Sequence, residues 1–321
     1  MKVLLFGHRG WIGQRFYEYL NSLMSKINIV CSDIRITPEH YDEIIDQIQR
    51  NYVTRVFVVV GTTRNNQHSI TTDTDTDTDT NTQTQNNTFN NDMTIDYVEN
   101  KLDINIQNNM TAQMIMANIG DKLHVHTTII GTGCIYDDTK HLEKHKISSH
   151  KYNETDIPNY NGSQYSLIKA TLNNYIVMTN SKNVLHLRIR MPIFNGYDPY
   201  DYIAKIIKYR HVIDVPNSMT VLNDFFPIIF DMMSKRYSGT YNIVNPQTIS
   251  PCEILKLYKQ IVDPDYTYDV ITTTELHKIT IGKRCNVELS TDKIERIYKI
   301  KLPDIKSSIV RILTNMVEKN V

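Results

Sequence analysis

The chain has 321 residues, of which 40% are hydrophobic, and its 35 basic side chains balance 35 acidic ones. This length suffices for one large core or two closely joined lobes, and the neutral balance gives no electrostatic case for nucleic acid or an anionic membrane as partner. No apolar run approaches the ~20 residues of a membrane span, and the first residues lack a signal-peptide pattern.

The N-terminal segment has the pattern of a dinucleotide-binding turn. Residues 2–6 are an apolar strand candidate, and Gly7, Gly10 and Gly13 follow it. Apolar residues then recur at helical spacing over residues 12–24. Glycines permit a tight turn and close backbone approach, and the first helical N–H groups receive a pyrophosphate. The G-x-x-G-x-x-G spacing is typical of short-chain dehydrogenases, and a Gly-rich turn without a ligand is the plainer alternative.

The next segments predict a parallel sheet. Residues 27–31 form the second strand candidate, and Ser32, Asp33 and Arg35 lie just beyond its end, where the ribose 2′ position of a cofactor is recognised. An acid there favours NAD, whereas Arg or Ser accommodates the 2′-phosphate of NADP, so local chemistry leaves both open. A helix over residues 38–50 leads to an apolar strand that ends at Gly61. Such alternation predicts a sheet covered on both faces.

Residues 69–91 consist largely of Thr, Asp, Asn and Gln repeats. This composition buries no apolar surface, so we predict a disordered or weakly ordered surface insertion. The carboxylates have neither the glycine turn nor the bidentate acid of a calcium loop. We therefore predict no metal site.

A catalytic constellation follows from the middle of the chain. A helix through Asn109 and a strand over residues 123–130 precede Thr132 and Cys134, which share one side of the chain if the strand alternation continues. Tyr165 and Lys169 are four residues apart and share one helix face. An ammonium beside a phenol is expected to lower the phenol pKa and make the Tyr a general acid for a carbonyl. On a surface helix such a pair is usually solvated, so the upstream cofactor turn gives it significance.

The remaining sequence predicts a second, smaller lobe. A strand over residues 184–190 ends the regular alternation, and a later strand near residues 241–246 is expected to return to the sheet. We therefore predict an α/β fold, a Rossmann-type doubly wound parallel sheet with a small interleaved C-terminal substrate lobe. Residues 1–192 form the cofactor domain and residues 193–321 mainly the lobe, with the ligand cleft between them.

Taken together, these motifs resemble those of extended short-chain dehydrogenases. More narrowly, the chain is similar to the nucleotide-sugar 4-reductases of rhamnose synthesis, and in particular to the bifunctional 3,5-epimerase/4-reductases that produce UDP-L-rhamnose. The similarity spans nearly the whole chain except the Thr/Asp-rich insertion. It is carried by residues 10–13, 131–135 (Gly-Thr-Gly-Cys-Ile), 158–165, 188–193 (Arg-Ile-Arg-Met-Pro-Ile), 203–206, 213–220 and 242–246.

The resemblance implies an activity and a set of residues. The activity is NADPH-dependent 3,5-epimerisation and 4-keto reduction of UDP-4-keto-6-deoxy-D-glucose to UDP-L-rhamnose, with NADH less favoured as cofactor. Thr132, Tyr165 and Lys169 would form the reductase triad, Asn109 would be the helix Asn of the fold, and Cys134 with Lys205 the epimerase pair. Expected cofactor contacts are Gly7, Arg9, Gly10, Trp11, Ile12, Gly13, Ser32, Arg35, Gly61, Tyr165 and Lys169. Expected substrate contacts are Thr132, Cys134, Arg190, Asn217, Ser218, Arg284 and Asn286.

The sequence is compatible with several alternatives. The enzyme could catalyse reduction alone, as a dTDP-4-dehydrorhamnose reductase does, or the chain could be a non-catalytic relative such as the regulatory subunit of methionine adenosyltransferase. Without the resemblance, Cys134 is most simply a small buried residue, Lys205 a solvent-facing charge, and Trp11 a packing residue. The four scattered cysteines favour a reducing, cytoplasmic location. UDP against dTDP is undecided, and a homodimer is one assembly considered.

Overall fold

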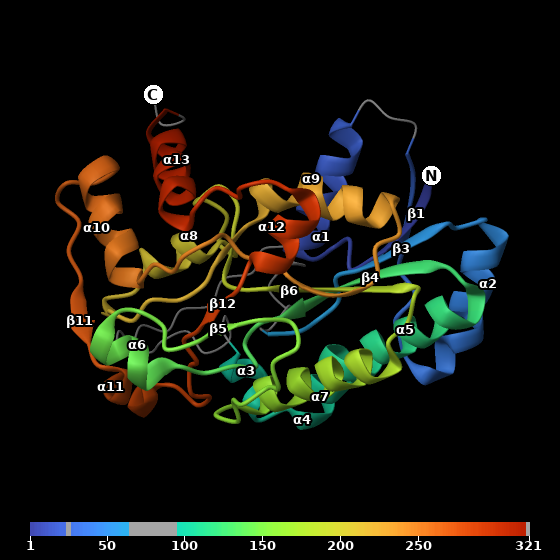
Figure 1. The fold of residues 1–321 in the computed structure, drawn as a ribbon, viewed down its shortest axis with the longest axis horizontal. Helices are drawn as coiled ribbons and strands as arrows, with labels where there is room; N and C mark the ends of the chain where they lie inside the picture. The colour runs from blue at the N-terminus through green and yellow to red at the C-terminus, as the bar shows by residue number, and fades with distance from the viewer. Residues whose placement is uncertain (24–26, 64–94, 319–321) are drawn as a thin grey trace, which may run out of the picture.

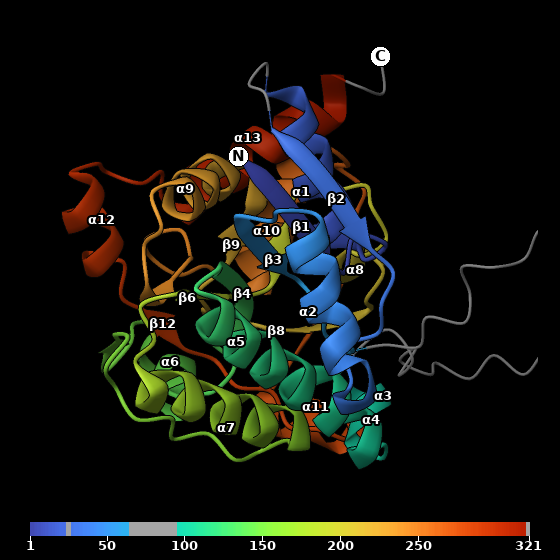
Figure 2. The ribbon, with the colours of Figure 1, turned by 90° about the vertical axis from the view of Figure 1, so that its right-hand side faces the viewer.

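The computed structural model describes residues 1–23, 27–63 and 95–318. A six-stranded parallel sheet forms its middle layer, and helices cover both faces (Figures 1 and 2). This architecture confirms the predicted α/β fold with a doubly wound parallel sheet. The predicted insertion, residues 69–91, lies outside the described residues. Across the sheet the strand order is β2 (Asn28–Ser32), β1 (Lys2–Phe6), β3 (Arg55–Val58), β4 (His126–Thr132), β6 (Val184–Ile189) and β10 (Gly239–Asn242).

The strand order reverses between β1 and β3. The chain leaves β1 to build β2 on one side and then crosses to build β3 on the other, so the loops after β1 and β3 diverge. In open α/β sheets a ligand binds in the crevice that such divergence leaves at the carboxyl ends of the strands. The glycine turn follows β1 and Gly61 follows β3, so both border this crevice.

The glycines of the turn are required by close packing. Gly7 has a φ of +85°, and a Cβ on it would lie 2.7 Å from the carbonyl oxygen of Val59 after β3. A Cβ on Gly13, in the first helix, would collide with the backbone of Gly7. Side chains at these positions would therefore push the first helix away from β1 and β3.

Two apolar cores lie on opposite faces of the sheet. One face carries α1 (Trp11–Ser22), α9 (Leu222–Ser234) and α12 (Asp292–Tyr298), and the other carries α2 (Tyr41–Arg50), α5 (Ala112–Leu123) and α7 (Gln164–Thr179). In the first core Phe16 stacks on Phe57, with ring centroids 4.2 Å apart, and meets Phe226 edge-on. In the second core Ile44 and Leu172 are buried. Each such side chain contributes ~1.5–3 kcal/mol when fully buried, so these layers fix the sheet beneath the site.

The strand that leads to the Gly131 motif lies further along the chain than predicted. Residues 123–130 were expected to form it, but Leu123 ends α5 and His124 adopts a left-handed conformation with φ of 53°. A residue in this conformation ends a helix and cannot continue a strand, and β4 therefore runs from His126 to Thr132. The shift places Gly131 and Thr132 within the strand.

The helix through Asn109 is interrupted. It consists of α4 (Leu102–Ile106), the π-helical turn η4 (Gln107–Thr111) and α5. A π turn inserts one residue into the helical ladder, and such turns often occur at functional sites. The Asn109 amide donates to Thr62 O at 2.7 Å and accepts from Thr62 N at 3.0 Å. Asn109 thus fastens the loop after β3, beside Gly61.

The C-terminal part adds a third apolar cluster beside the sheet. It is shared by α8 (Tyr202–Ile206), α10 (Pro251–Ile261) and α13 (Ile305–Glu318). Tyr241 and Asn242 of β10 pair with Leu187 and Arg188, so the chain returns to the sheet before this cluster is completed. The expected return at residues 241–246 therefore begins two residues earlier, and residues 243–246 follow the strand.

None of the helices in the described part of the chain is long and apolar enough to cross a membrane.

Short strands and helices connect the sheet to the C-terminal part. Parallel pairs join β7 (Pro192–Ile193) to β9 (Thr220–Val221), β8 (His211–Ile213) to β11 (Asp269–Ile271) and β5 (Lys151–Tyr152) to β12 (Glu288–Leu289). The other short helices described are η1 (Pro38–His40), α3 (Asp96–Glu99), α6 (Thr139–His145) and α11 (Thr273–Ile279).

The glycine packing leads to a stability test. We expect Gly13→Ala to lower the free energy of unfolding by about 1–3 kcal/mol, because its methyl group meets the backbone of the turn. Gly10→Ala is the matched control, since a Cβ there would meet only Gly7 O, at 3.2 Å. Urea unfolding at 25 °C measures both. Equal stability of the two variants would contradict the packing argument.

Candidate active site

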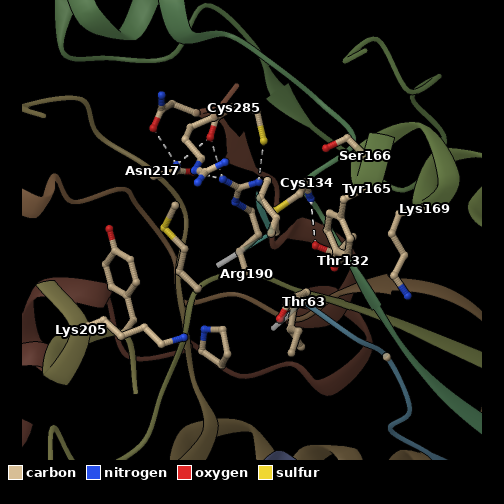
Figure 3. A pocket seen from close by; sticks show the side chains of 18 of the residues that line it. Thr63, Thr132, Cys134, Tyr165, Ser166, Lys169, Arg190, Lys205, Asn217 and Cys285 are labelled. Carbon is tan, nitrogen blue, oxygen red and sulfur yellow. Dashed lines mark hydrogen bonds between the residues drawn. The ribbon is translucent and has the colours of Figure 1, made fainter. Parts of the chain in front are cut away.

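A cavity of about 440 Å³ lies at the carboxyl ends of the sheet strands. Its wall includes Gly61 after β3, the end of β4 and the end of β6, and Ile12 in the first turn of α1 extends it to the glycine turn. Figure 3 shows Lys205 on one side of this cavity and Tyr165 with Lys169 on the other. The predicted catalytic residues that line it are Asn109, Thr132, Cys134, Tyr165, Lys169 and Lys205.

The start of α7 positions the Tyr/Lys pair. Ser163 caps the helix by accepting from the backbone N–H of Ser166 at 3.1 Å. Glu99 of α3 accepts from the N–H of Gln164 and of Tyr165, at 2.8 and 3.1 Å. These bonds satisfy helical N–H groups that have no partner within the helix. The first turn of α7 is therefore held firmly.

Tyr165 and Lys169 are both buried, with 8% and 5% of their surface exposed. The Lys169 Nζ donates to Gln113 Oε1 at 3.0 Å, and the Gln113 amide donates to Val60 O at 2.7 Å. This chain of bonds joins α7, α5 and the segment after β3. It holds the ammonium between the tyrosine helix and the crevice at the switch point.

The expected lowering of the Tyr165 pKa is wrong for this arrangement. Burial raises the pKa of the Tyr165 phenol, the nearby Cys134 adds to the rise, and a hydrogen bond with Thr132 opposes it. Burial also lowers the pKa of the Lys169 ammonium to about 7. Because the phenol stays protonated at neutral pH, Tyr165 can still donate a proton, as a general acid must.

Two sulfurs and a guanidinium form the wall next to Tyr165 (Figure 3). Arg190, which follows β6 and is 1% exposed, donates to Cys285 Sγ at 3.3 Å, to Cys285 O at 3.1 Å and to Asn217 Oδ1 at 2.8 Å. The Cys134 backbone N–H donates to Thr132 Oγ1 at 3.1 Å. A hydrogen bond from Cys285 lowers the pKa of the Cys134 thiol, and Arg190 supports this against the effect of burial.

The predicted substrate contacts divide into two groups. Arg190, Asn217, Arg284 and Asn286 line the cavity. Ser218 is outside the cavity lining and fully buried, and its Oγ accepts from the N–H of Leu289 at 2.9 Å. This bond gives Ser218 a structural role behind the wall.

Arg284 has an acidic partner that sequence reasoning missed. Its guanidinium donates to both carboxylate oxygens of Asp96, at 3.0 and 2.7 Å. Asp96, in α3, is only 3% exposed. A bidentate pair of this kind fixes the geometry of the guanidinium, so Arg284 presents a held donor rather than a mobile charge.

The glycine turn fits a dinucleotide. No side chain caps α1 at its N-terminus, where Gly10 is the N-cap residue, so its first N–H groups can receive a phosphate. The buried Trp11 Nε1 has no hydrogen-bond partner in the described part of the chain. Ile12 and Gly61 border the cavity that contains Tyr165. The turn and the Tyr/Lys pair thus lie along one continuous surface.

The end of β2 carries charged residues near the expected 2′ position. Arg9 lies 2.8 Å from Asp33, so the one acid that would favour NAD is engaged by a cation. Arg35 lines a separate cavity of about 810 Å³ at this end. The Ser32 hydroxyl donates to Gln47 Oε1 at 2.7 Å, which makes Ser32 a weaker candidate for a phosphate contact than Arg9 or Arg35.

Cys285 and Tyr160 also line the cavity but were not predicted. The Tyr160 hydroxyl is buried and has no hydrogen-bond partner among the described residues. Cys285 lies between the predicted contacts Arg284 and Asn286, and this position was the available signal. Its proximity to Cys134, 151 positions earlier in the sequence, depends on tertiary structure and leaves no local pattern.

The parallel sheet, the glycine turn and the Tyr165/Lys169 face define an enzyme of the short-chain dehydrogenase type. No protein-family model matches the chain. It is 31% identical to protein L780 of Acanthamoeba polyphaga mimivirus over 318 residues, which cover 98% of this chain and 99% of that protein. A crystal structure described as the L780 UDP-rhamnose synthase has a TM-score of 0.83 at 29% identity, and the match covers 98% and 99% of the two chains.

A plant relative defines the family. The chain is 33% identical over 219 residues to the bifunctional dTDP-4-dehydrorhamnose 3,5-epimerase/dTDP-4-dehydrorhamnose reductase of Arabidopsis thaliana, covering 68% of this chain and 71% of that protein. The chain therefore belongs to the family of bifunctional nucleotide-sugar 3,5-epimerase/4-reductases, which confirms the resemblance. A dTDP-4-dehydrorhamnose reductase structure from Clostridium acetobutylicum, at 13% identity and a TM-score of 0.73 over 99% of this chain and 100% of that one, shares the Rossmann-type fold.

The buried Lys169 leads to a test of stability against pH. The unfolded chain holds this proton up to about pH 10.5, whereas the native chain releases it near pH 7. Between these values the unfolded state binds more protons, so the free energy of unfolding rises with pH, by at most ~1.4 kcal/mol per pH unit. We expect Lys169→Met to lose this slope in urea unfolding at pH 7, 8 and 9. Lys259→Met, at an exposed site on α10, should keep it; equal slopes for both variants would contradict the assignment.

Proposed function

We propose that this protein catalyses the NADPH-dependent 3,5-epimerisation and 4-keto reduction of UDP-4-keto-6-deoxy-D-glucose to UDP-L-rhamnose. The observation that carries the proposal is that a phenol, a thiol and two amines, those of Tyr165, Cys134, Lys169 and Lys205, line one cavity. The relative L780, described as a UDP-rhamnose synthase, supports UDP as the nucleotide.

The cofactor contacts follow from the crevice. The glycine turn and the N-terminus of α1 would hold the pyrophosphate, with Ile12 and Gly61 beside the nicotinamide. Arg9 and Arg35 would bind the 2′-phosphate, which favours NADPH over NADH. The bound cofactor supplies the hydride for carbon 4. NADP- and NADPH-bound structures of the same fold are consistent with this choice.

Epimerisation requires a base and an acid on opposite faces of the sugar. The ketone at carbon 4 acidifies the hydrogens on carbons 3 and 5, because the resulting carbanion is delocalised as an enolate. Cys134, with its lowered pKa, would remove each proton. Lys205 of α8, on the opposite wall in Figure 3, would return a proton to the other face. Each centre is inverted without net oxidation, and before the second inversion Cys134 releases its proton to solvent and Lys205 takes one up.

Reduction requires a proton for the carbon 4 oxygen as the hydride arrives at the carbon. Tyr165 would donate it, since the raised pKa keeps the phenol protonated. The Thr132 hydroxyl would orient the same oxygen. Lys169, fixed by Gln113, would restore the proton to Tyr165, and Asn109 would hold the loop at Gly61 in place.

The division into a cofactor domain, residues 1–192, and a nucleotide-sugar lobe, residues 193–321, is part of this proposal. The separate apolar cluster of α8, α10 and α13 supports the lobe. Asn217, Asn286 and the Asp96-bound Arg284 would contact the sugar diphosphate from the lobe side of the cavity.

A reactive thiol in the cavity favours the reducing cytoplasm as the location of the protein. A homodimer is the assembly included in this proposal, and sedimentation velocity tests it.

The direct test is turnover of UDP-4-keto-6-deoxy-D-glucose by the purified protein in D₂O. We expect one NADPH oxidised per UDP-L-rhamnose formed, with deuterium at carbons 3 and 5. Tyr165→Phe should slow reduction by about 10²–10⁴-fold, whereas Tyr175→Phe, on the same helix but packed in the second core, should retain activity. NADPH oxidation that persists unchanged in Tyr165→Phe would contradict the role of the phenol.

Cys134→Ala separates the two half-reactions. We expect it to reduce deuterium uptake at carbons 3 and 5 by about 10²-fold or more, while reduction of an already epimerised 4-keto sugar continues. Cys31→Ser, at an exposed cysteine, is the control. Deuterium uptake unchanged in Cys134→Ala would remove this thiol as the base. Turnover of only the epimerised sugar by the wild type would favour the reduction-only alternative.

A further inference from the structure

The Asp201 carboxyl group is fully buried and accepts four hydrogen bonds from the backbone. Its Oδ2 atom accepts from three successive N–H groups, those of Phe194 at 2.6 Å, Asn195 at 3.0 Å and Gly196 at 3.1 Å. Its Oδ1 atom accepts from the N–H of Ile203 at 2.8 Å. Burial raises the pKa of this carboxyl, and the backbone bonds oppose the rise. Because a carboxylate that accepts N–H bonds binds more strongly than a neutral acceptor, Asp201 joins two stretches of backbone.

Asp201 is also the residue at which α8 begins. It is the N-cap residue of this helix, and its backbone oxygen accepts from the N–H of Lys205 at 3.1 Å. The helix has five residues, and an isolated helix of this length is not stable in water. Its position therefore depends on the cap and on packing. The packing comes from Ile203 and Ile206, which belong to the apolar cluster shared with α10 and α13.

The loop between β7 and α8, residues 194–201, is fastened on its other side to the cofactor helix. Within the loop, Asn195 Oδ1 accepts from the N–H of Asp198 at 3.2 Å. The Asp198 carboxylate accepts from the N–H of Tyr200 at 3.0 Å and from the Arg15 guanidinium of α1 at 2.9 Å. The start of α8 is therefore held relative to the helix that follows the glycine turn.

The position of α8 determines where Lys205 enters the cavity. Tyr202, Lys205 and Ile206 line the cavity, and Figure 3 shows Lys205 on the side opposite Tyr165. A lysine side chain is long and flexible, so the helix that carries it limits where its ammonium can reach. A misplacement of about 1 Å at a reacting group can cost on the order of 10²-fold in rate.

We propose that Asp201 is a positioning residue for epimerisation: by joining residues 194–196 to the first turn of α8, it holds Lys205 where the ammonium can protonate the face of the sugar opposite Cys134. The inference rests on the proposed function, which assigns this proton transfer to Lys205. Asp201 is itself outside the cavity lining, so its effect passes through the helix.

A purely structural role for Asp201 leads to a different result. If the carboxylate only stabilised the fold, its loss would lower epimerisation and reduction together, in proportion to the amount of folded protein. Reduction depends on Thr132 of β4 and Tyr165 of α7, which are not part of the loop or of α8. A displaced α8 should therefore slow inversion at carbons 3 and 5 and spare the reduction of a sugar that is already epimerised.

The ratio of these two rates tests the inference. Inversion of UDP-4-keto-6-deoxy-D-glucose is followed by NMR with NADP⁺ present, which cannot reduce the sugar, and reduction of the epimerised 4-keto sugar is followed by NADPH oxidation. We expect Asp201→Asn to lower the ratio of inversion to reduction by about 10- to 10²-fold, because an amide must turn its NH₂ group toward backbone N–H donors. Lys205→Met is the reference and should lower the same ratio.

Asp304→Asn is the matched control. The Asp304 carboxylate accepts from the N–H of Ser307 at 2.9 Å in the first turn of α13, a helix of the same apolar cluster. The described lining of the cavity includes no residue of α13, so the ratio should be unchanged. Hydrogen exchange read by mass spectrometry supplies a measurement without substrate. The amides of residues 202–207 should exchange faster in Asp201→Asn than in the wild type, and at the wild-type rate in Asp304→Asn.

An unchanged ratio in a folded Asp201→Asn protein overturns the inference. Asp201→Ser, whose hydroxyl can still accept from Ile203, takes its place if the Asn variant does not fold. If the wild type fails to invert the UDP-sugar, the proposed function is refuted, and hydrogen exchange then decides on Asp201 alone. Faster exchange over residues 202–207 supports its hold on α8, whereas unchanged exchange overturns it, so the two failures are distinguishable.

Discussion

The hydrogen bonds of Arg190 join three distant parts of the chain. The residue follows β6, and its guanidinium reaches Asn217 and Cys285, 27 and 95 residues further on. It thereby holds the C-terminal part against the end of the sheet and closes the wall of the cavity. The same buried charge determines which protonation states are stable around it. Architecture and chemistry therefore depend on one side chain.

Burial and neighbouring groups shift the pKa values in this cavity in directions that suit acid–base catalysis. It keeps the Tyr165 phenol protonated and brings the pKa of Lys169 to about 7, while hydrogen bonding from Cys285 and the charge of Arg190 favour the Cys134 thiolate. A proton donor and a proton acceptor thus coexist on one wall at neutral pH. Neighbouring groups with pKa values pushed apart are the usual sign of acid and base assignments.

Local sequence patterns were sufficient to predict part of the fold and part of the candidate site. Tyr165 and Lys169 share a helix face because of their spacing, and the glycine turn follows from Gly7, Gly10 and Gly13. The start of β4 was misplaced because the left-handed His124 has no sequence signature. Lys169 bonds to Gln113, which is 56 residues away in the sequence. Arg284 bonds to Asp96, which is 188 residues away. Long-range packing also reversed the expected pKa of Tyr165, since spacing says nothing about burial.

A structure of the protein with NADP⁺ and UDP-L-rhamnose tests the central claim most directly. The account predicts the hexose carbon 4 oxygen within hydrogen-bond distance of Tyr165 Oη and Thr132 Oγ1. It also predicts the Cys134 sulfur and the Lys205 ammonium on opposite faces of the ring, with reacting atoms about 3–3.5 Å apart. A hexose bound outside this cavity, or a Cys134 sulfur turned away from carbons 3 and 5, would contradict it.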